Sequence, residues 1–222
     1  MTDFTAARLN MVESQVRPNG ITDRRIIAAM EDVPREMFVP ERFRAVAYVD
    51  EDVPLAPAEE KQGPRALIEA MAFARLLQHA EIKPEDRVLV VGAGTGYGAA
   101  VIARIAAHVV ALESDPGLVS EARERLVGLR SVVVVEGWLP AGAMAQQPFN
   151  VIVLEGRAEE VPQSLLGQLA EGGRLVAVVG ETVLARAKVF SKAGQTIAVR
   201  DAFDASVAAL PGFGKKKPAF VF

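Results

Sequence analysis

The sequence predicts an α/β protein with a doubly wound, mostly parallel sheet of seven strands, an N-terminal helical cap and a C-terminal antiparallel hairpin. First, a strand-like apolar run, 88–91, ends in a glycine cluster and passes directly into a helix-like run of small residues, 99–103. Second, apolar runs and helical segments then alternate up to residue 179. Third, two strand-like segments flank Ala193-Gly194-Gln195, a pattern typical of a hairpin.

Seven apolar segments account for the sheet. The predicted strands are 88–91, 109–113, 132–135, 149–154, 174–179, 185–191 and 196–203, and the predicted helices between them include 115–126 and 162–169. Segment 149–154 is continuously apolar, as a parallel strand buried on both faces should be. The tail, 211–222, is predicted to end in a short edge strand.

The first 80 residues hold more helix than such a sheet needs. Helical spacing covers 4–17, and Asp23 is a suitable N-cap for a helix over 24–32. The polar stretch 50–63 is predicted to be a loop, and Pro64 to begin a helix that continues to Gln78. We therefore expect one domain, 1–222, with a cap or substrate roof over 1–80, a ligand-binding core over 81–180, and a hairpin and tail over 181–222.

Composition excludes several classes of function. A chain of 222 residues suits one α/β domain with an appendage and is too short for the two large domains usual in nicotinamide dehydrogenases. The net charge of −3, without a strongly basic region, gives no reason to expect nucleic acid as a partner. The absence of cysteine excludes disulfides, thiolate zinc sites and cysteine nucleophiles, and two histidines are too few for a multi-histidine metal site. We expect no metal.

No segment predicts insertion into a membrane. Residues 1–8 lack the continuous apolar stretch of a signal peptide. The most apolar helical region, 99–112, contains Arg104 and His108 and is too short to span a bilayer. We therefore expect a cytoplasmic protein without a membrane partner. No interface pattern predicts an oligomeric state.

The glycine cluster indicates a ligand site. Glycines let the main chain approach a ligand where a Cβ would intervene. Gly92-x-Gly94-x-Gly96 is compatible with S-adenosylmethionine (SAM), whereas Gly94-x-Gly96-x-x-Ala99 also fits a dinucleotide fingerprint. Glu113 ends the next strand, where an acid hydrogen-bonds ribose hydroxyls in nucleotide-binding folds of this kind. Glu113 supports a nucleoside ligand without choosing between the two cofactors, and a purely structural turn beside a solvated glutamate is the alternative.

Longer motifs resemble one family, the protein-L-isoaspartate O-methyltransferases, which are SAM-dependent enzymes. The resemblance covers roughly residues 9–180. Its most specific part is Val33-Pro-Arg-Glu-x-Phe-Val-Pro40 ahead of Gly92-x-Gly-x-Gly-Tyr97, and Leu169-x-x-Gly-Gly-Arg-Leu-Val176 also matches. It implies the Rossmann-like class I methyltransferase fold, SAM as cofactor, and a protein-repair activity that methylates the carboxylate of a damaged aspartyl residue in proteins or peptides.

The resemblance also implies roles for individual residues. Gly92, Gly94 and Gly96 would face the methionine part of SAM, and Glu113 would hold the ribose. Gly137 and Trp138 would border the adenine. From its position in the first turn after the glycines, rather than from the resemblance, Tyr97 would flank the methionine tail, with core packing as an equally good alternative.

The substrate loop departs from the family pattern. The family motif Gly-Gln-Thr-Ile-Ser-Gln-Pro corresponds here to Ala58-Glu-Glu-Lys-Gln-Gly-Pro64, so Glu60 replaces the threonine and Gln62 the serine. These two positions are the candidate catalytic residues, because the family's hydroxyls lie where the acceptor carboxylate meets the cofactor. A glutamate about 4 Å from that carboxylate costs on the order of 4 kcal/mol at an effective dielectric of about 20. We hypothesise that isoaspartyl methylation is reduced or lost.

Other functions remain open at this point. Glu60 as a general base would suit an amine or hydroxyl acceptor, on a small molecule or a protein; alternatively, the loop glutamates point to solvent. A second departure places Trp138 where the family has an acid that binds the adenine amine. Trp138 would stack on adenine or fill its pocket. A catalytically silent SAM-binding protein is therefore a further alternative.

Overall fold

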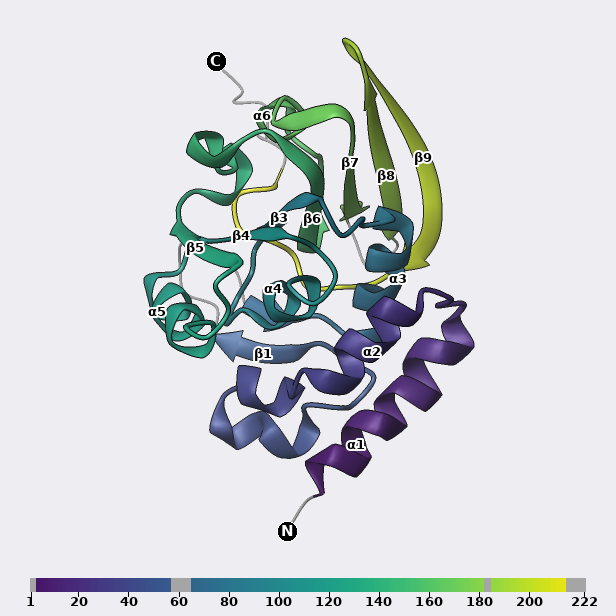
Figure 1. Ribbon diagram of the computed structural model, residues 1–222, viewed down its shortest axis with the longest axis vertical. Helices are drawn as coiled ribbons and strands as arrows, with labels where there is room; N and C mark the ends of the chain where they lie inside the picture. The colour runs from purple at the N-terminus through teal and green to yellow at the C-terminus, as the bar shows by residue number, and fades with distance from the viewer. Residues whose placement is uncertain (1–2, 57–64, 182–184, 215–222) are drawn as a thin grey trace, which may run out of the picture.

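The computed structural model describes residues 3–56, 65–181 and 185–214, and its centre is a seven-stranded sheet (Figure 1). The strand order is β5-β4-β3-β6-β7-β8-β9, and the first five of these are parallel whereas β8 and β9 are antiparallel. The strands are β3 (Arg87–Val91), β4 (His108–Glu113), β5 (Val132–Glu136), β6 (Phe149–Ala158), β7 (Leu169–Val179), β8 (Ala185–Ala193) and β9 (Thr196–Ala205). The predicted fold class and all seven predicted strands are confirmed.

Helices cover both faces of the sheet. They are α3 (Ala70–Ala80), α4 (Tyr97–Ile102), α5 (Pro116–Arg125) and the short α6 (Gln163–Leu166). Successive residues of β3 alternate between two apolar clusters: Val88 and Val90 pack with α3, α4 and α5, whereas Leu89 and Val91 pack with α6. Burial on both faces explains why the central strands are continuously apolar.

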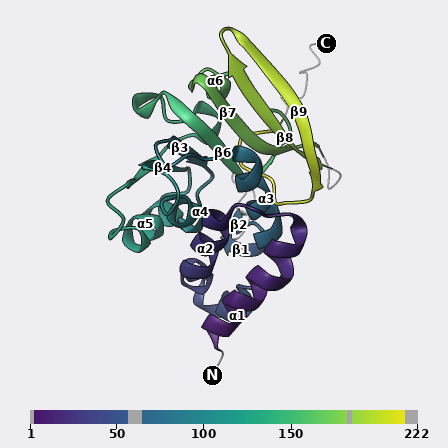
Figure 2. The ribbon, with the colours of Figure 1, turned by 45° about the vertical axis from the view of Figure 1, so that its right-hand side comes forward.

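The cap consists of helical segments at one end of the molecule (Figures 1 and 2). They are α1 (Phe4–Met11), a π-helical turn (Val12–Val16), α2 (Arg24–Asp32), and 3₁₀ helices over Arg17–Asn19, Arg35–Phe38 and Glu41–Val46. Asp23 caps α2 as predicted, since its Oδ1 accepts a hydrogen bond from the backbone N–H of Arg25 at 2.8 Å. Arg35 is fully buried and donates to the carbonyls of Ala47 and Ile68, which ties the cap to the start of α3. The domain limits at residues 80 and 180 stay predictions.

Two expectations for residues 50–78 are wrong. Strand β1 (Val53–Ala56) lies in the predicted loop, and β2 (Arg65–Leu67) lies where a helix was predicted to begin. The two pair as an antiparallel hairpin, in which Val53 lies opposite Leu67. Tertiary pairing overrides the helical spacing here, and the helix begins only with α3. The N–H of Glu69, the residue before α3, donates a hydrogen bond to Asp52 Oδ1.

After β9, residues 206–214 run across the ends of the central strands, and we call them the C-terminal strap. In Figure 1 the strap is the yellow trace that passes behind β6 and β3. The N–H of Ala208 donates to Asp52 Oδ2 at 2.6 Å, and Ala208 O accepts from the N–H of Arg157. Leu210 N–H donates to Arg157 O, so the strap binds to the end of β6. The edge strand predicted within 211–222 falls largely on residues outside the described ranges.

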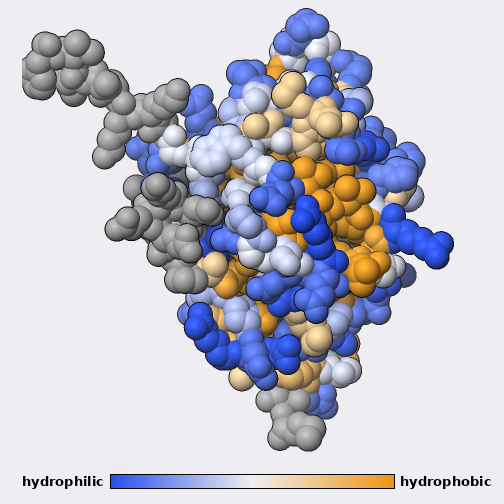
Figure 3. Space-filling model, turned by 90° about the vertical axis from the view of Figure 1, so that its left-hand side faces the viewer, coloured by the Kyte–Doolittle hydropathy of each residue, from blue (hydrophilic) through white to orange (hydrophobic). Residues whose placement is uncertain are grey.

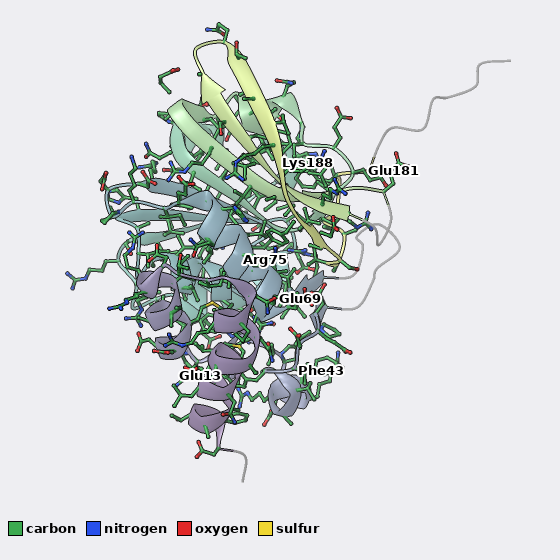
Figure 4. All side chains as sticks on the ribbon, turned by 90° about the vertical axis from the view of Figure 1, so that its right-hand side faces the viewer. Glu13, Phe43, Glu69, Arg75, Glu181 and Lys188 are labelled. Carbon is green, nitrogen blue, oxygen red and sulfur yellow. The ribbon has the colours of Figure 1, made fainter. Side chains whose placement is uncertain are left out.

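The hairpin β8–β9 packs on α3. The Arg75 guanidinium lies 3.9 Å from the centre of the Phe203 ring, and the His79 ring stacks on the same phenylalanine. Figure 4 shows Arg75 and Glu69 between the cap and this hairpin. His79 is therefore a packing residue.

At the other edge of the sheet, β5 leaves apolar side chains exposed. Val133 is 49% exposed, and the view from the β5 side shows an apolar area on that face (Figure 3). Within the described ranges, none of the helices combines the length and apolar character needed to cross a bilayer. In the same part of the chain, no three acidic, histidine or cysteine side chains come together as a metal site would require.

Candidate cofactor and active site

The turn between β3 and α4 contains the three glycines of the predicted ligand site. Gly92, Gly94 and Gly96 all have positive φ angles, of 79°, 56° and 99°, a backbone conformation that glycine adopts without a steric penalty. The N–H groups of Gly92 and Ala93 both donate to the carbonyl of Leu112 on β4. The turn is therefore held rigidly at the carboxyl end of β3, where ligands bind in doubly wound folds.

Glu113, the predicted ribose ligand, lies at the carboxyl end of β4 and is fully buried. Its Oε2 accepts hydrogen bonds from Arg65 Nη2 at 2.6 Å and from the Gly94 N–H at 2.8 Å. Its Oε1 accepts from the N–H groups of Ser114 and Asp115. Burial by itself would raise the pKa of Glu113, but Arg65 and these N–H groups outweigh it and the pKa is lowered. The carboxylate is ionised and lies against the glycine turn.

Apolar side chains lie directly against each glycine of the turn. A Cβ added at Gly92 would be 2.5 Å from Leu210 Cδ2 of the strap, and one at Gly94 would be 2.6 Å from Leu55 Cδ1. Both distances are too short for a real side chain. The glycines offer backbone without side chains and Glu113 offers a carboxylate, which are the groups that a nucleoside sulfonium requires. Leu210 and the Arg65 side chain both lie directly against Gly92.

A cluster of buried charges surrounds the turn. Arg35, Arg65, Glu113 and Glu155 are all less than 5% exposed. Arg35 Nη1, Arg65 Nε and Glu155 Oε1 have no hydrogen-bond partner in the described part of the chain. Burial raises the pKa of Glu155 to about 8, although Arg65 and Arg35 act to lower it. Such unsatisfied buried groups are rare in folded proteins and call for an explanation.

The remaining predicted site residues lie in different surroundings. Tyr97 is buried against the rings of Phe38 and Phe73. Gly137 follows β5, and its N–H donates to the carbonyl of Glu113. Trp138 is 58% exposed, and its ring lies against Gly212 of the strap. The two candidate catalytic residues, Glu60 and Gln62, lie outside the described residues.

Sequence reasoning missed three residues of this site: Arg65, Glu155 and Leu210. Arg65 fell within a predicted helix, and Leu210 belonged to no predicted element or site. Glu155 follows the apolar run of β6 in the same way that Glu113 follows that of β4. An acid at the end of the neighbouring strand was thus a signal that the sequence contained.

Comparison with known proteins decides between the two cofactor classes. Residues 7–211 match the sequence profile of protein-L-isoaspartate(D-aspartate) O-methyltransferase. The chain belongs to this family. A protein-L-isoaspartate O-methyltransferase of Methanoculleus marisnigri is 41% identical over 175 residues, 78% of this chain and 77% of that protein. A protein of the same name from Koribacter versatilis is 38% identical over 186 residues, 83% of this chain and 81% of its relative.

Structural comparison supports the same fold for this family member. A crystal structure of a Plasmodium falciparum protein described as a putative protein-L-isoaspartate O-methyltransferase, in complex with S-adenosyl-L-homocysteine, superimposes with a TM-score of 0.75. The match covers 95% of this chain and 99% of that one at 19% identity. The family resemblance, the class I methyltransferase fold and the assignment as a SAM-dependent methyltransferase are thus confirmed.

Proposed function

We propose that this family member transfers a methyl group from SAM to the carboxylate of damaged aspartyl residues in proteins or peptides. The match of residues 7–211 to the family carries this proposal. It is supported by a glycine turn whose Gly94 N–H and neighbouring Glu113 form one buried unit. SAM supplies an electrophilic methyl group, and an ionised carboxylate is already a competent nucleophile. The site therefore needs to align the reactants and exclude water, which is worth about 7–11 kcal/mol, and needs no general base.

The residues that would hold SAM divide by chemistry. Glu113 would accept hydrogen bonds from the ribose, and the backbone of Gly92, Gly94 and Gly96 would face the methionine part. Gly137 and Trp138 would border the adenine, with Trp138 stacking on it once its contact with Gly212 is released. Tyr97 would contribute indirectly, because its packing on Phe38 and Phe73 holds the start of α4 in place. Glu60 and Gln62 would meet the acceptor.

The activity can be tested with tritiated SAM and two peptides that differ only in carrying an isoaspartyl or an ordinary aspartyl residue. We expect base-labile methyl ester on the isoaspartyl peptide alone, formed slowly because Glu60 repels the carboxylate. The variant Glu60→Thr/Gln62→Ser, which restores the family residues, should be faster. A variant no faster than the parent would show that the loop does not limit the reaction.

Two other results would replace the proposal. S-adenosylhomocysteine binding without any isoaspartyl ester would favour an amine or hydroxyl acceptor, with Glu60 as general base. A folded protein that binds neither SAM nor its product would favour a non-catalytic protein that keeps the fold but has lost the cofactor. The cytoplasmic location stays a prediction, which fractionation of cells expressing the chain would check.

A further inference from the structure

Glu155 is a buried acid with a free oxygen beside the glycine turn. Leu154 pairs with Val91 of β3, so Glu155 is placed opposite Gly92, the first glycine of the turn. The side chain is 4% exposed, and its Oε1 accepts no hydrogen bond from any residue in the described part of the chain. A Cβ added at Gly98 would overlap Oε1. Glycine at position 98 therefore lets the carboxyl group reach the first turn of α4.

The neighbouring arginines do not pair with Glu155. Arg65 places its Nη2 on Glu113, and Arg35 donates to the carbonyls of Ala47 and Ile68. Neither arginine is within hydrogen-bonding distance of Glu155 Oε1. An unpaired buried carboxyl group is costly, and a cationic ligand that reached it would remove that cost.

The ligand expected at this turn carries such a cation. SAM and S-adenosylhomocysteine each have an ammonium group in their amino-acid part, which the glycines from Gly92 to Gly96 would face. Glu113 would be occupied by the ribose, and both its oxygens already accept hydrogen bonds from the chain. Among the acids that the structure describes beside the turn, Glu155 is the one with an oxygen that accepts no hydrogen bond.

We propose that Glu155 binds the ammonium group of SAM and of S-adenosylhomocysteine. This inference rests on the proposed function, because it assumes that the turn binds these ligands. Leu210 contacts both Gly92 and Gly156. Gly92, which follows the neighbouring strand β3, lies opposite Glu155, and Gly156 is the next residue in the chain. Displacement of Leu210 by the ligand would open the space in which the ammonium reaches the carboxylate.

The test compares S-adenosylhomocysteine with 5′-methylthioadenosine, which has the same nucleoside and sulfur but no amino-acid part. Calorimetry on the full chain measures both dissociation constants for the parent, for Glu155→Gln and for the control Glu124→Gln, an exposed acid of α5. We expect Glu155→Gln to weaken S-adenosylhomocysteine by about tenfold or more and methylthioadenosine by less than about twofold. The control should change neither. Equal weakening of both ligands, or no weakening, would overturn the inference.

A second readout needs no variant. Glu155 holds its proton at pH 7, because its pKa is about 8, and it would lose that proton on pairing with an ammonium group. Titrations in two buffers of different ionisation enthalpy should therefore show close to one proton released with S-adenosylhomocysteine and none with methylthioadenosine. Equal proton release with both ligands would contradict the role of Glu155 but leave the proposed function standing. A parent protein that binds neither ligand would contradict the proposed function instead.

Discussion

The Arg65 guanidinium lies 2.6 Å from the Glu113 carboxylate, on the oxygen that also accepts the N–H of Gly94. The acid expected to bind ribose is thus paired within the chain, by a residue of the β1–β2 hairpin. Both side chains are at most 2% exposed. A ribose hydroxyl would have to replace this internal cation or share the carboxylate with it.

Removal of Arg65 should destabilise the fold strongly. Arg65→Met leaves Glu113 buried without its counter-ion, and we expect a loss of about 3–5 kcal/mol in the free energy of unfolding, measured with urea. The matched control is Arg104→Met, which breaks the exposed pair with Asp32 and should cost less than about 1 kcal/mol. A similar, small cost for both variants would show that the buried pair contributes no more than a surface one.

Glu155 should make stability fall as the pH rises. Its folded-state pKa of about 8 lies above the ordinary value of 4.5, so the native state keeps a proton that the unfolded chain releases. The stabilising contribution is complete below about pH 4.5 and is lost as the pH rises towards 8, at up to about 1.4 kcal/mol per pH unit. Urea unfolding at several pH values should show that the free energy of unfolding of Glu155→Gln rises relative to that of the parent across this window. A difference that does not change with pH would exclude a raised pKa.

Shortening Leu210 should open the cofactor turn. Leu210 is 4% exposed and lies on Gly92 and Gly156, so Leu210→Ala should lower the free energy of unfolding by about 2–5 kcal/mol. Its affinity for S-adenosylhomocysteine should rise, because the ligand no longer has to displace the leucine. Val207→Ala, a buried change in the same strap, should lower stability without raising affinity. Weaker binding by the Leu210 variant would mean that this side chain supports the ligand site.

Gly98→Ala should be destabilising because of Glu155. The new methyl group would overlap the carboxyl group, and forcing it in should cost about 1–3 kcal/mol. The cost should fall when Glu155 is also changed to alanine, which a double-mutant cycle of unfolding free energies measures. Gly128→Ala is the control, since nothing lies within 4 Å of its added Cβ. Additive effects of the two changes would show that the contact is relieved elsewhere.

Local sequence patterns predicted the strands well because the environment of each strand is simple. Val88 to Val91 are buried on both faces and read as a continuous apolar run. The helix predicted over residues 65–67 is wrong, because helical spacing is also compatible with a short strand and only pairing with 53–56 decides between them. Because a helix was predicted there, Arg65 was not expected to reach Glu113 and was not identified as a site residue.

By itself, the sequence determined the sheet, the glycine turn, the acid at the end of β4 and the family, because each depends on residues that are close together in the chain or on a motif. Only the tertiary structure decided what surrounds that turn. Arg65 lies 48 residues before Glu113, and Ala208 of the strap lies 156 residues after Asp52. Contacts of such separation leave no period or spacing in the sequence, so the buried charges around the turn and the leucine over it become visible only when the chain is folded.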